Sequence, residues 1–286
     1  MFNDKRLREI YKDADETNYL LEIGYNKSRN DNKQFGVDLT KPKGDNLWGR
    51  MLLNRIEHAP KPLDLRNSLE VCCGNGFLFF SLSQFCKTDC SSHFIDISIT
   101  QIKDFSDRVH NLRASAPQML VGDVLELPYS NGTFNLVYGN SFLHHLPDVG
   151  AGLREFSRVL RPGGCFIAFH EPTHTAPWLE NILAQLKQIV SQCEVSNSLT
   201  DIWLFKPLHI SHFIKDCGFS SACTVPRNLL SSFFVSPIQT CLGEIGLPRW
   251  NKPVIFAKIL CDTLDKLFPA QVRQAWSPSL ALIAIK

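Results

Sequence analysis

The stretch from Ser68 to Phe80, "SLEVCCGNGFLFF", decides the fold. Its first residues predict a strand, Gly74 and Gly76 predict a tight loop, and the apolar residues that follow predict a helix. A glycine loop of this kind presents bare backbone and the free N–H groups of a helix start to a ligand. A strand-to-helix turn without a ligand is the structural alternative, and a lone G-x-G motif does not decide between the two.

Short apolar runs alternate with amphipathic segments on the C-terminal side of this loop. The runs predict strands at 68–72, 92–97, 118–121, 133–138 and 164–170, and the segments between and after them predict helices at 76–86, 99–113, 148–160 and 178–192. Strand, helix and strand in this rhythm indicate βαβ units and a parallel sheet with helices on both faces. Outside this block, the sequence predicts helices at 45–57 and 208–219, a strand in "SSACTVP", an apolar helix in "PVIFAKILCDTLDKLF" and a final strand, "SLALIAIK", which we expect at an edge of the sheet.

The composition is that of an ordinary globular chain. The 286 residues are 44% hydrophobic and 20% charged, and the formal net charge is +2. This balance predicts no strong attraction to nucleic acid or to an anionic membrane, although composition does not reveal a local basic patch. The first residues lack the apolar run of a secretory signal, and the apolar stretches are too short to span a bilayer, so we expect a cytoplasmic protein.

The ten cysteines are then expected to be thiols. They form no C-x-x-C pair, so we expect no metal site. Most of them are expected to act as small buried apolar residues.

Polar residues at the ends of successive predicted strands narrow the choice of ligand. Phe79 stands where a dinucleotide-binding loop needs its third glycine, which argues against a nicotinamide site. Asp96 follows the second strand, 20 residues after Gly76 (96 − 76), where a carboxylate accepts hydrogen bonds from ribose hydroxyls. Asp123 and Asn140 end the third and fourth strands.

Taken together, these motifs resemble the class I S-adenosylmethionine-dependent methyltransferases, in particular their small-molecule branch. The resemblance covers residues 65 to 175 well and extends weakly to the C-terminus. It implies an α/β, Rossmann-like, doubly wound and mostly parallel seven-stranded sheet, with helices on both faces and an antiparallel last strand. The implied cofactor is S-adenosyl-L-methionine, and the product is S-adenosyl-L-homocysteine.

The resemblance also assigns residues to parts of the cofactor. Asp96 would hold the ribose with Ile97 beside the adenine, and Asp123 would bind the adenine amino group with the Val124 N–H on a ring nitrogen. The remaining cofactor contacts that it implies are Glu70, Cys72, Gly74, Asn75, Gly76, Asn140 and Phe142, with Tyr25 as a lid. As structural alternatives, Asp123 would stabilise a turn and Asp96 would cap a helix.

Cys72 departs from the family pattern, which has glycine at that position. A Cβ and a sulfur atom would therefore lie near the methionyl part of the cofactor, which leaves open weakened binding, repositioned binding or loss of activity. This departure keeps open a binding module without methyl transfer.

Three residues past the fourth and fifth strands are candidates for catalysis: His144, His145 and Glu171. A histidine there could accept a proton from the acceptor, or could cap or pack a short helix. Glu171 could position an amine or hydroxyl, or could bond to backbone. A base is needed only if the acceptor loses a proton, because alignment and exclusion of water account for most of the catalysis of methyl transfer.

The predicted organisation has four parts. They are an N-terminal helical or lid segment at 1–60, a cofactor-binding core at 61–227, a helical insertion at 228–276 and the final strand of the core at 277–286. The insertion would form a lid, a substrate pocket or a dimer contact. The implied function is methyl transfer to a small, partly apolar or aromatic acceptor at an O, N or C atom, with no nucleic-acid partner, no stable membrane insertion and a homodimer as an option. A sulfonium-assisted cyclase or isomerase is the alternative within the same fold.

Overall fold

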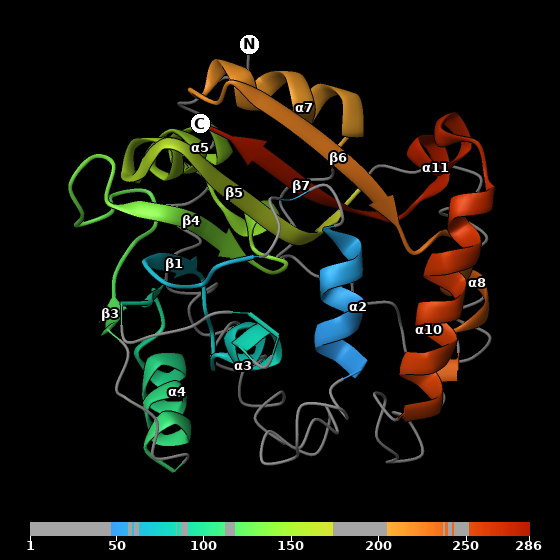
Figure 1. Ribbon diagram of the computed structural model, residues 1–286, viewed down its shortest axis with the longest axis horizontal. Coiled ribbons are helices and arrows are strands. Elements are labelled where there is room, and N and C mark those ends of the chain that lie inside the picture. The colour runs from blue at the N-terminus through green and yellow to red at the C-terminus, as the bar shows by residue number, and fades with distance from the viewer. Residues whose placement is uncertain are drawn as a thin grey trace.

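A computed structural model describes residues 47–56, 59, 63–83, 85–86, 91–111, 118–173, 205–236, 238–239, 242 and 252–286. The described residues form one seven-stranded sheet with the order β3-β2-β1-β4-β5-β7-β6 (Figure 1). β7 is antiparallel to both of its neighbours, and the other strands run parallel to one another. The strands are β1 (Ser68–Val71), β2 (His93–Asp96), β3 (Gln118–Val121), β4 (Phe134–Gly139), β5 (Leu160–Pro172), β6 (Ser221–Arg227) and β7 (Ser279–Ile285).

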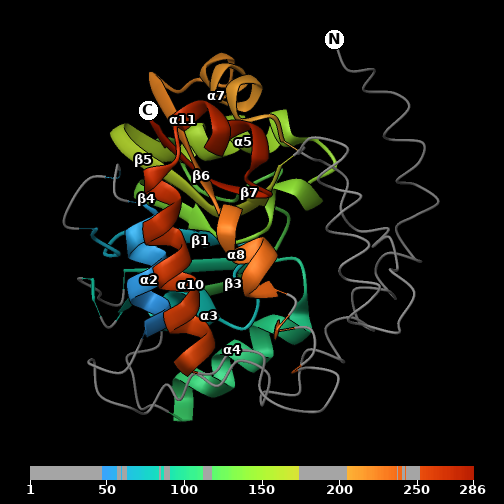
Figure 2. The same cartoon turned by 90° about the vertical axis from the view of Figure 1, so that its right-hand side faces the viewer.

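The helices lie on both faces of this sheet (Figure 2). They are α2 (Leu47–Arg55), α3 (Phe77–Ser83), α4 (Ile99–Asn111), α5 (Val149–Val159), α7 (Pro207–Asp216), α8 (Leu229–Phe234), α10 (Lys252–Leu264) and α11 (Ala270–Trp276), with short 3-10 helices η2 (Leu143–His145) and η3 (Asp265–Leu267). This architecture confirms the predicted fold class. Among the residues that the structure describes, none of the helices combines the length and hydropathy needed to cross a bilayer.

Alternating side chains of the central strands supply a separate core to each face of the sheet. On one face, Val137 and Phe166 pack with Phe156 of α5 and residues of α7. On the other face, Leu136 and Ile167 pack with residues of α2 and α3. Successive strand side chains point to opposite faces, so strands that are apolar throughout need helices on both sides.

The predicted elements are confirmed to within a few residues where the structure describes them. The strand at 118–121 has the predicted bounds, and the fifth strand extends beyond its predicted ends to Leu160 and Pro172. The helix predicted at 178–192 lies outside the described residues.

One prediction about the last strand is wrong. β7 does not close an edge of the sheet, because it pairs with both β5 and β6. Its residues from Ser279 to Ala284 are all buried. An apolar strand of this kind needs cover on both faces and a neighbour on each side, so it lies inside the sheet and leaves β6 at the edge.

Candidate functional site

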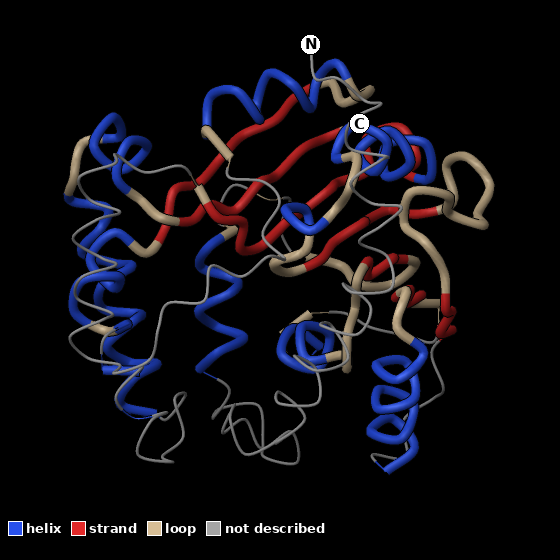
Figure 3. The backbone as a smooth tube through the Cα atoms, turned by 180° about the vertical axis from the view of Figure 1, so that it is seen from behind, coloured by secondary structure: helices blue, strands red, loops and turns tan. Residues whose placement is uncertain are grey.

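The chain reverses its direction across the sheet between β1 and β4. β1, β2 and β3 lie in chain order toward one side, whereas β4 and β5 lie toward the other (Figure 3). Ligands of open α/β sheets bind outside the carboxyl ends of the strands at this switch point. The predicted site residues follow these strand ends in the spatial order Asp123, Asp96, the 72–76 loop and Asn140.

The loop after β1 has a left-handed backbone at several positions. Gly74 has φ +53°, and Gly76 has φ +75°. A Cβ on Gly76 would lie 2.3 Å from Cε2 of Phe105, a core residue of α4, so the loop needs glycine there. The Cys73 N–H donates to the carbonyl oxygen of Ile95 at 3.2 Å, which ties the loop to β2.

Cys72 adopts the same left-handed conformation, with φ +49°. A left-handed backbone carries a steric cost for any residue with a Cβ, which explains why glycine suits this position. Cys72 therefore holds, under strain, a backbone conformation that glycine adopts at little cost.

Replacing Cys72 by glycine is expected to raise the free energy of unfolding by about 0.5–1 kcal/mol. The strain of a left-handed cysteine, about 1–2 kcal/mol, would exceed the entropy cost of an added glycine. Urea unfolding measures the change. Cys73→Gly is the matched control, because Cys73 is buried and has no positive φ, so this variant should lose stability. If Cys72→Gly and Cys73→Gly lose the same free energy of unfolding, the backbone of Cys72 is not strained.

Asp96 closes the loop from the end of β2. Its Oδ2 accepts a hydrogen bond from the Gly74 N–H at 2.8 Å, and its Oδ1 accepts one from the Ser98 N–H at 2.9 Å. Burial raises the pKa of Asp96, and the Ser98 and Gly74 N–H groups oppose this rise. A carboxylate has about four acceptor sites, so two remain for other donors.

Glu70 lies beneath the loop on β1 and is almost completely buried, with 1% of its surface exposed. Its Oε2 atom makes no hydrogen bond. Tyr138 is its register partner on β4, although the two groups do not meet hydrogen-bond geometry. Burial raises the pKa of Glu70 well above 4.5; the nearby Tyr138 hydroxyl opposes the rise, and the charge of Asp96 adds to it.

Replacing Glu70 by glutamine is expected to stabilise the cofactor-free protein, and more so as the pH rises. A carboxyl with a raised folded pKa contributes stability that is present below its unfolded pKa and lost as the pH rises through the folded pKa. Glutamine does not titrate, so the gain over wild type should reach about 1–3 kcal/mol at alkaline pH. Thermal unfolding between about pH 5 and 8 measures it. Glu126→Gln, at an exposed glutamate, is the control. A gain that does not change with pH would contradict the raised pKa of the buried Glu70 carboxyl.

Asp123 and Ile97 are accessible at the ends of β3 and β2. Asp123 is exposed, and its Oδ1 accepts a hydrogen bond from the Leu125 N–H at 2.9 Å, as in a turn. Ile97 is 65% exposed directly after Asp96, whereas Val124 is buried. An accessible carboxylate beside an exposed apolar side chain fits a planar, polar-edged ring.

The turn after β4 contains Asn140, which is partly buried, and Ser141, which has φ +57°. Phe142 follows with 2% of its surface exposed, and its ring packs against Phe156 and Phe166. The ring of Phe142 is therefore buried by protein side chains and needs no ligand to cover it.

Glu171 lies near the end of β5 and is completely buried. Its Oε1 accepts from the Phe142 and Leu143 N–H groups, and its Oε2 accepts from the His144 N–H, each at 3.1 Å. Glu171 therefore holds the start of η2 from β5, in agreement with the alternative of a bond to backbone. Its role in catalysis stays a prediction.

The same carboxylate orients a histidine. His144 Nδ1 lies 2.6 Å from Glu171 Oε2, in a pair whose side chains are 5% and 0% exposed. An ionised carboxylate only accepts, so in a hydrogen bond to ionised Glu171 the donor is His144 Nδ1–H. The ring of His145 lies against that of His144, with centroids 3.9 Å apart, and His145 is the more exposed of the two.

Two features of this site were not anticipated from the sequence, and one predicted residue is not described. Tyr138, beside Glu70 on the neighbouring strand, was missed, although it lies only two residues before Asn140 in the chain. The Ser98 N–H on Asp96 was missed as well. Tyr25, the predicted lid residue, lies outside the described residues.

The comparisons with known proteins agree with this geometry. Residues 69–168, which contain the loop, Asp96, Asp123, Asn140 and the two histidines, match the family model described as a methyltransferase domain. The chain carries a class I S-adenosylmethionine-dependent methyltransferase domain. The strand order, the antiparallel β7 and the loop after β1 are thus those of a methyltransferase domain.

Curated relatives match part of this chain. The demethylmenaquinone methyltransferase of Staphylococcus saprophyticus is 30% identical over 117 residues, which are 38% of this chain and 46% of that protein. The 27-O-demethylrifamycin SV methyltransferase of Amycolatopsis mediterranei is 34% identical over 99 residues, which are 34% of this chain and 35% of that protein. This chain therefore spans less than half the length of these relatives.

Solved structures share the fold at low sequence identity. The phosphoethanolamine N-methyltransferase 2 of Haemonchus contortus, in complex with S-adenosyl-L-methionine, matches 83% of this chain and 52% of its own, with a TM-score of 0.55 and 16% identity. The [4+2]-cyclase SpnF matches 88% of this chain and 85% of its own, with a TM-score of 0.52 and 15% identity. These likenesses concern the methyltransferase fold alone.

Proposed function

We propose that this chain binds S-adenosyl-L-methionine and transfers its methyl group to a small, partly apolar or aromatic acceptor at an O, N or C atom. The observation that carries the proposal is the row of carboxylates Asp123, Asp96 and Glu70, which follows adjacent strands to the switch point of a methyltransferase domain. The cofactor presents hydrogen-bond donors and positive charge along its length, and a row of acceptors is complementary to both.

The residues fit the parts of the cofactor in strand order. Asp123 would accept from the adenine amino group next to the Val124 N–H, and exposed Ile97 would contact the ring. Asp96 has acceptor capacity for both ribose hydroxyls. Glu70 Oε2, buried and without a hydrogen bond, would be satisfied by the cofactor's amino group. Cys72, Gly74, Asn75, Gly76 and Asn140 would line the methionyl part.

The bound cofactor would supply an activated methyl group, and the residues of this chain would align the acceptor and exclude water. His145 is the more exposed histidine past β4, so we assign the contact with the acceptor to it. Buried Glu171 and His144 would act as positioning residues, since they fix the turn that carries His145. His145 would take up a proton from acceptors that need to lose one.

The acceptor class rests on the relatives and on the apolar composition of the 228–276 segment. The relatives named above methylate demethylmenaquinone and 27-O-demethylrifamycin SV, both larger and less polar than an amino acid. In this proposal, the 228–276 insertion contributes to the acceptor pocket or covers it. A second candidate, a cyclase, is motivated by the fold of SpnF and by the strained Cys72 beside the predicted sulfonium.

Titration with S-adenosylhomocysteine tests the proposal. Calorimetry on the folded protein should give saturable binding, and no binding at high micromolar ligand would overturn it. Mass spectrometry of small-molecule extracts incubated with isotopically labelled cofactor should then reveal a product with one added methyl group. A transformed compound without that gain would support the cyclase, and binding without any product would support the binding module.

A further inference from the structure

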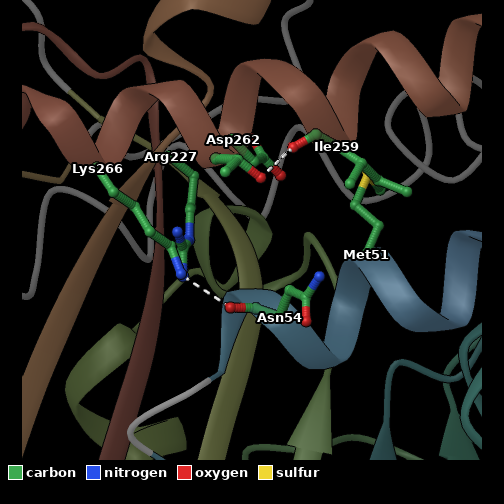
Figure 4. Close-up of a pocket in the computed structure, with 7 residues that line it drawn as sticks. Met51, Asn54, Arg227, Ile259, Asp262 and Lys266 are labelled. Carbon is green, nitrogen blue, oxygen red and sulfur yellow. Dashed lines mark hydrogen bonds between the residues drawn. The ribbon is translucent and has the colours of Figure 1, made fainter.

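Buried charges of this protein are balanced in one place by the protein itself. Asp262, Arg227 and Lys266 line a pocket between α2 and α10 (Figure 4). Arg227 also donates a hydrogen bond to the Asn54 carbonyl oxygen of α2 at 3.0 Å. A carboxylate that shares its pocket with cationic side chains has its counter-charge within the chain, so its ionised form is stabilised without a ligand.

The carboxyl groups of Glu70 and Asp96 lie on adjacent strands and have no such partner. Glu70 on β1 is 1% exposed, and Asp96 at the end of β2 is 9% exposed. Among the residues that the structure describes, no lysine, arginine or histidine forms an ion pair or a hydrogen bond with either carboxyl group. Asp96 accepts from two backbone N–H groups, whereas Glu70 Oε2 accepts no hydrogen bond. The charged form of Asp96 is therefore better stabilised than that of Glu70.

The surroundings of the two acids determine which of them holds a proton in the cofactor-free protein. Burial raises the pKa of both acids, and two backbone N–H groups oppose the rise at Asp96. At Glu70, a hydroxyl on β4 and the Phe79 N–H of α3 oppose the rise, whereas the charge of Asp96 adds to it. Burial also raises the pKa of Tyr138, which supplies this hydroxyl, and of the Cys73 thiol in the loop, so both stay protonated. An ionised Asp96 beside a protonated Glu70 is the arrangement that these contacts favour.

We propose that Glu70 releases a proton to water when a nucleoside that carries a primary ammonium group binds along the loop after β1. Glu70 is a neutral acid before binding and a carboxylate paired with the ammonium group afterwards, so the net charge buried around Glu70 is unchanged. This proton release rests on the proposed function, because it takes place in the methionyl part of the proposed cofactor site. The ligand class that the site selects is then a nucleoside thioether or sulfonium with a free amino group.

The affinity for such a ligand is expected to depend on pH. Because binding releases a proton, the association constant should rise about tenfold for each pH unit while unbound Glu70 is protonated. The increase should level off once the pH exceeds the pKa of unbound Glu70. A ligand without the ammonium group leaves Glu70 protonated and should lack this contribution.

Calorimetric titration in two buffers of different ionisation enthalpy counts the protons that binding releases. At about pH 6, wild type should release about one more proton with S-adenosylhomocysteine than with 5′-methylthioadenosine. The second ligand has the same nucleoside and sulfur atom but no amino-acid part, so any proton from Asp96 is common to both. Glu70→Gln should release equal numbers with the two ligands. Glu126→Gln, at an exposed glutamate, is the matched control and should behave as wild type.

Difference infrared spectroscopy gives a second readout that needs only S-adenosylhomocysteine. The C=O band of a protonated carboxyl group should disappear when this ligand is added to wild type or to Glu126→Gln. The band change should be absent in Glu70→Gln, because glutamine has no carboxyl proton to lose.

The possible failures of the proton release and of the proposed function are distinct. If S-adenosylhomocysteine binds wild type without the extra proton and without the band change, the proton release is wrong and the cofactor site stands. If Glu70→Gln releases the same number of protons as wild type, a group other than Glu70 titrates and the assignment is wrong. If S-adenosylhomocysteine does not bind folded wild type, the proposed function fails, and the proton release fails with it.

Discussion

Replacing Asp96 by alanine is expected to weaken the binding of S-adenosylhomocysteine about a hundredfold. In the proposed complex, Asp96 accepts from two ribose hydroxyls, and each hydrogen bond to a charged group contributes about 1.5–3 kcal/mol. A tenfold change in the dissociation constant corresponds to about 1.4 kcal/mol, so two such bonds account for at least a hundredfold. Calorimetric titration measures the change.

Two other variants show whether this loss is specific. Asp107→Ala removes an exposed carboxylate from α4 and should leave the affinity unchanged. Asp123→Ala removes a single acceptor and should weaken binding by about tenfold. Because Asp96 also accepts from Gly74 and Ser98, thermal unfolding of each variant is needed to confirm that the protein is folded. An unchanged affinity in folded Asp96→Ala protein would remove Asp96 from the site.

Replacing Glu171 by alanine is expected to lower the free energy of unfolding by about 3–5 kcal/mol. The variant leaves the N–H groups of Phe142, Leu143 and His144 without their buried acceptor, and it removes the partner of the His144 ring. Each unsatisfied buried group costs about 1–3 kcal/mol. Denaturant unfolding measures the loss.

Three companion variants separate stability from chemistry. Glu171→Gln keeps one acceptor oxygen, so its loss should be intermediate. Glu126→Ala, at an exposed glutamate, should change stability by less than about 0.5 kcal/mol. His145→Asn should leave stability near that of wild type and lower the rate of methyl transfer at neutral pH. If Glu171→Ala unfolds at the same denaturant concentration as wild type, the assignment of Glu171 as a positioning residue is wrong.

The sequence allowed two interpretations of Glu171, a contact with the acceptor or a hydrogen bond to backbone, and it could not decide between them. The sequence indicated that an acid follows the fifth strand, beside the histidines that follow the fourth. Its hydrogen bonds join residues that are 27 to 29 positions apart, and they depend on how β4 and β5 pair. Only the assembled sheet distinguishes a carboxylate that reaches an acceptor from one that holds a turn.

The position of β7 and the backbone conformation of Cys72 also depend on contacts between distant parts of the chain. Apolar runs predicted that "SLALIAIK" is a strand, but its place between β5 and β6 depends on pairing with segments far away in the chain. The sequence revealed cysteine in place of glycine at position 72. The energetic cost of this cysteine arises from its φ of +49°, which the packed loop imposes.

By itself, the sequence determined the order of strands and helices, the α/β class and the row of polar residues that we propose for the cofactor. These depend on local periodicity, on turn residues and on the rule that parallel strands end at the same edge of a sheet. The tertiary structure decided which carboxylates are buried and which histidine is held. Burial and hydrogen bonding arise between residues distant in the chain, so they are decided only when the sheet and its helices pack together.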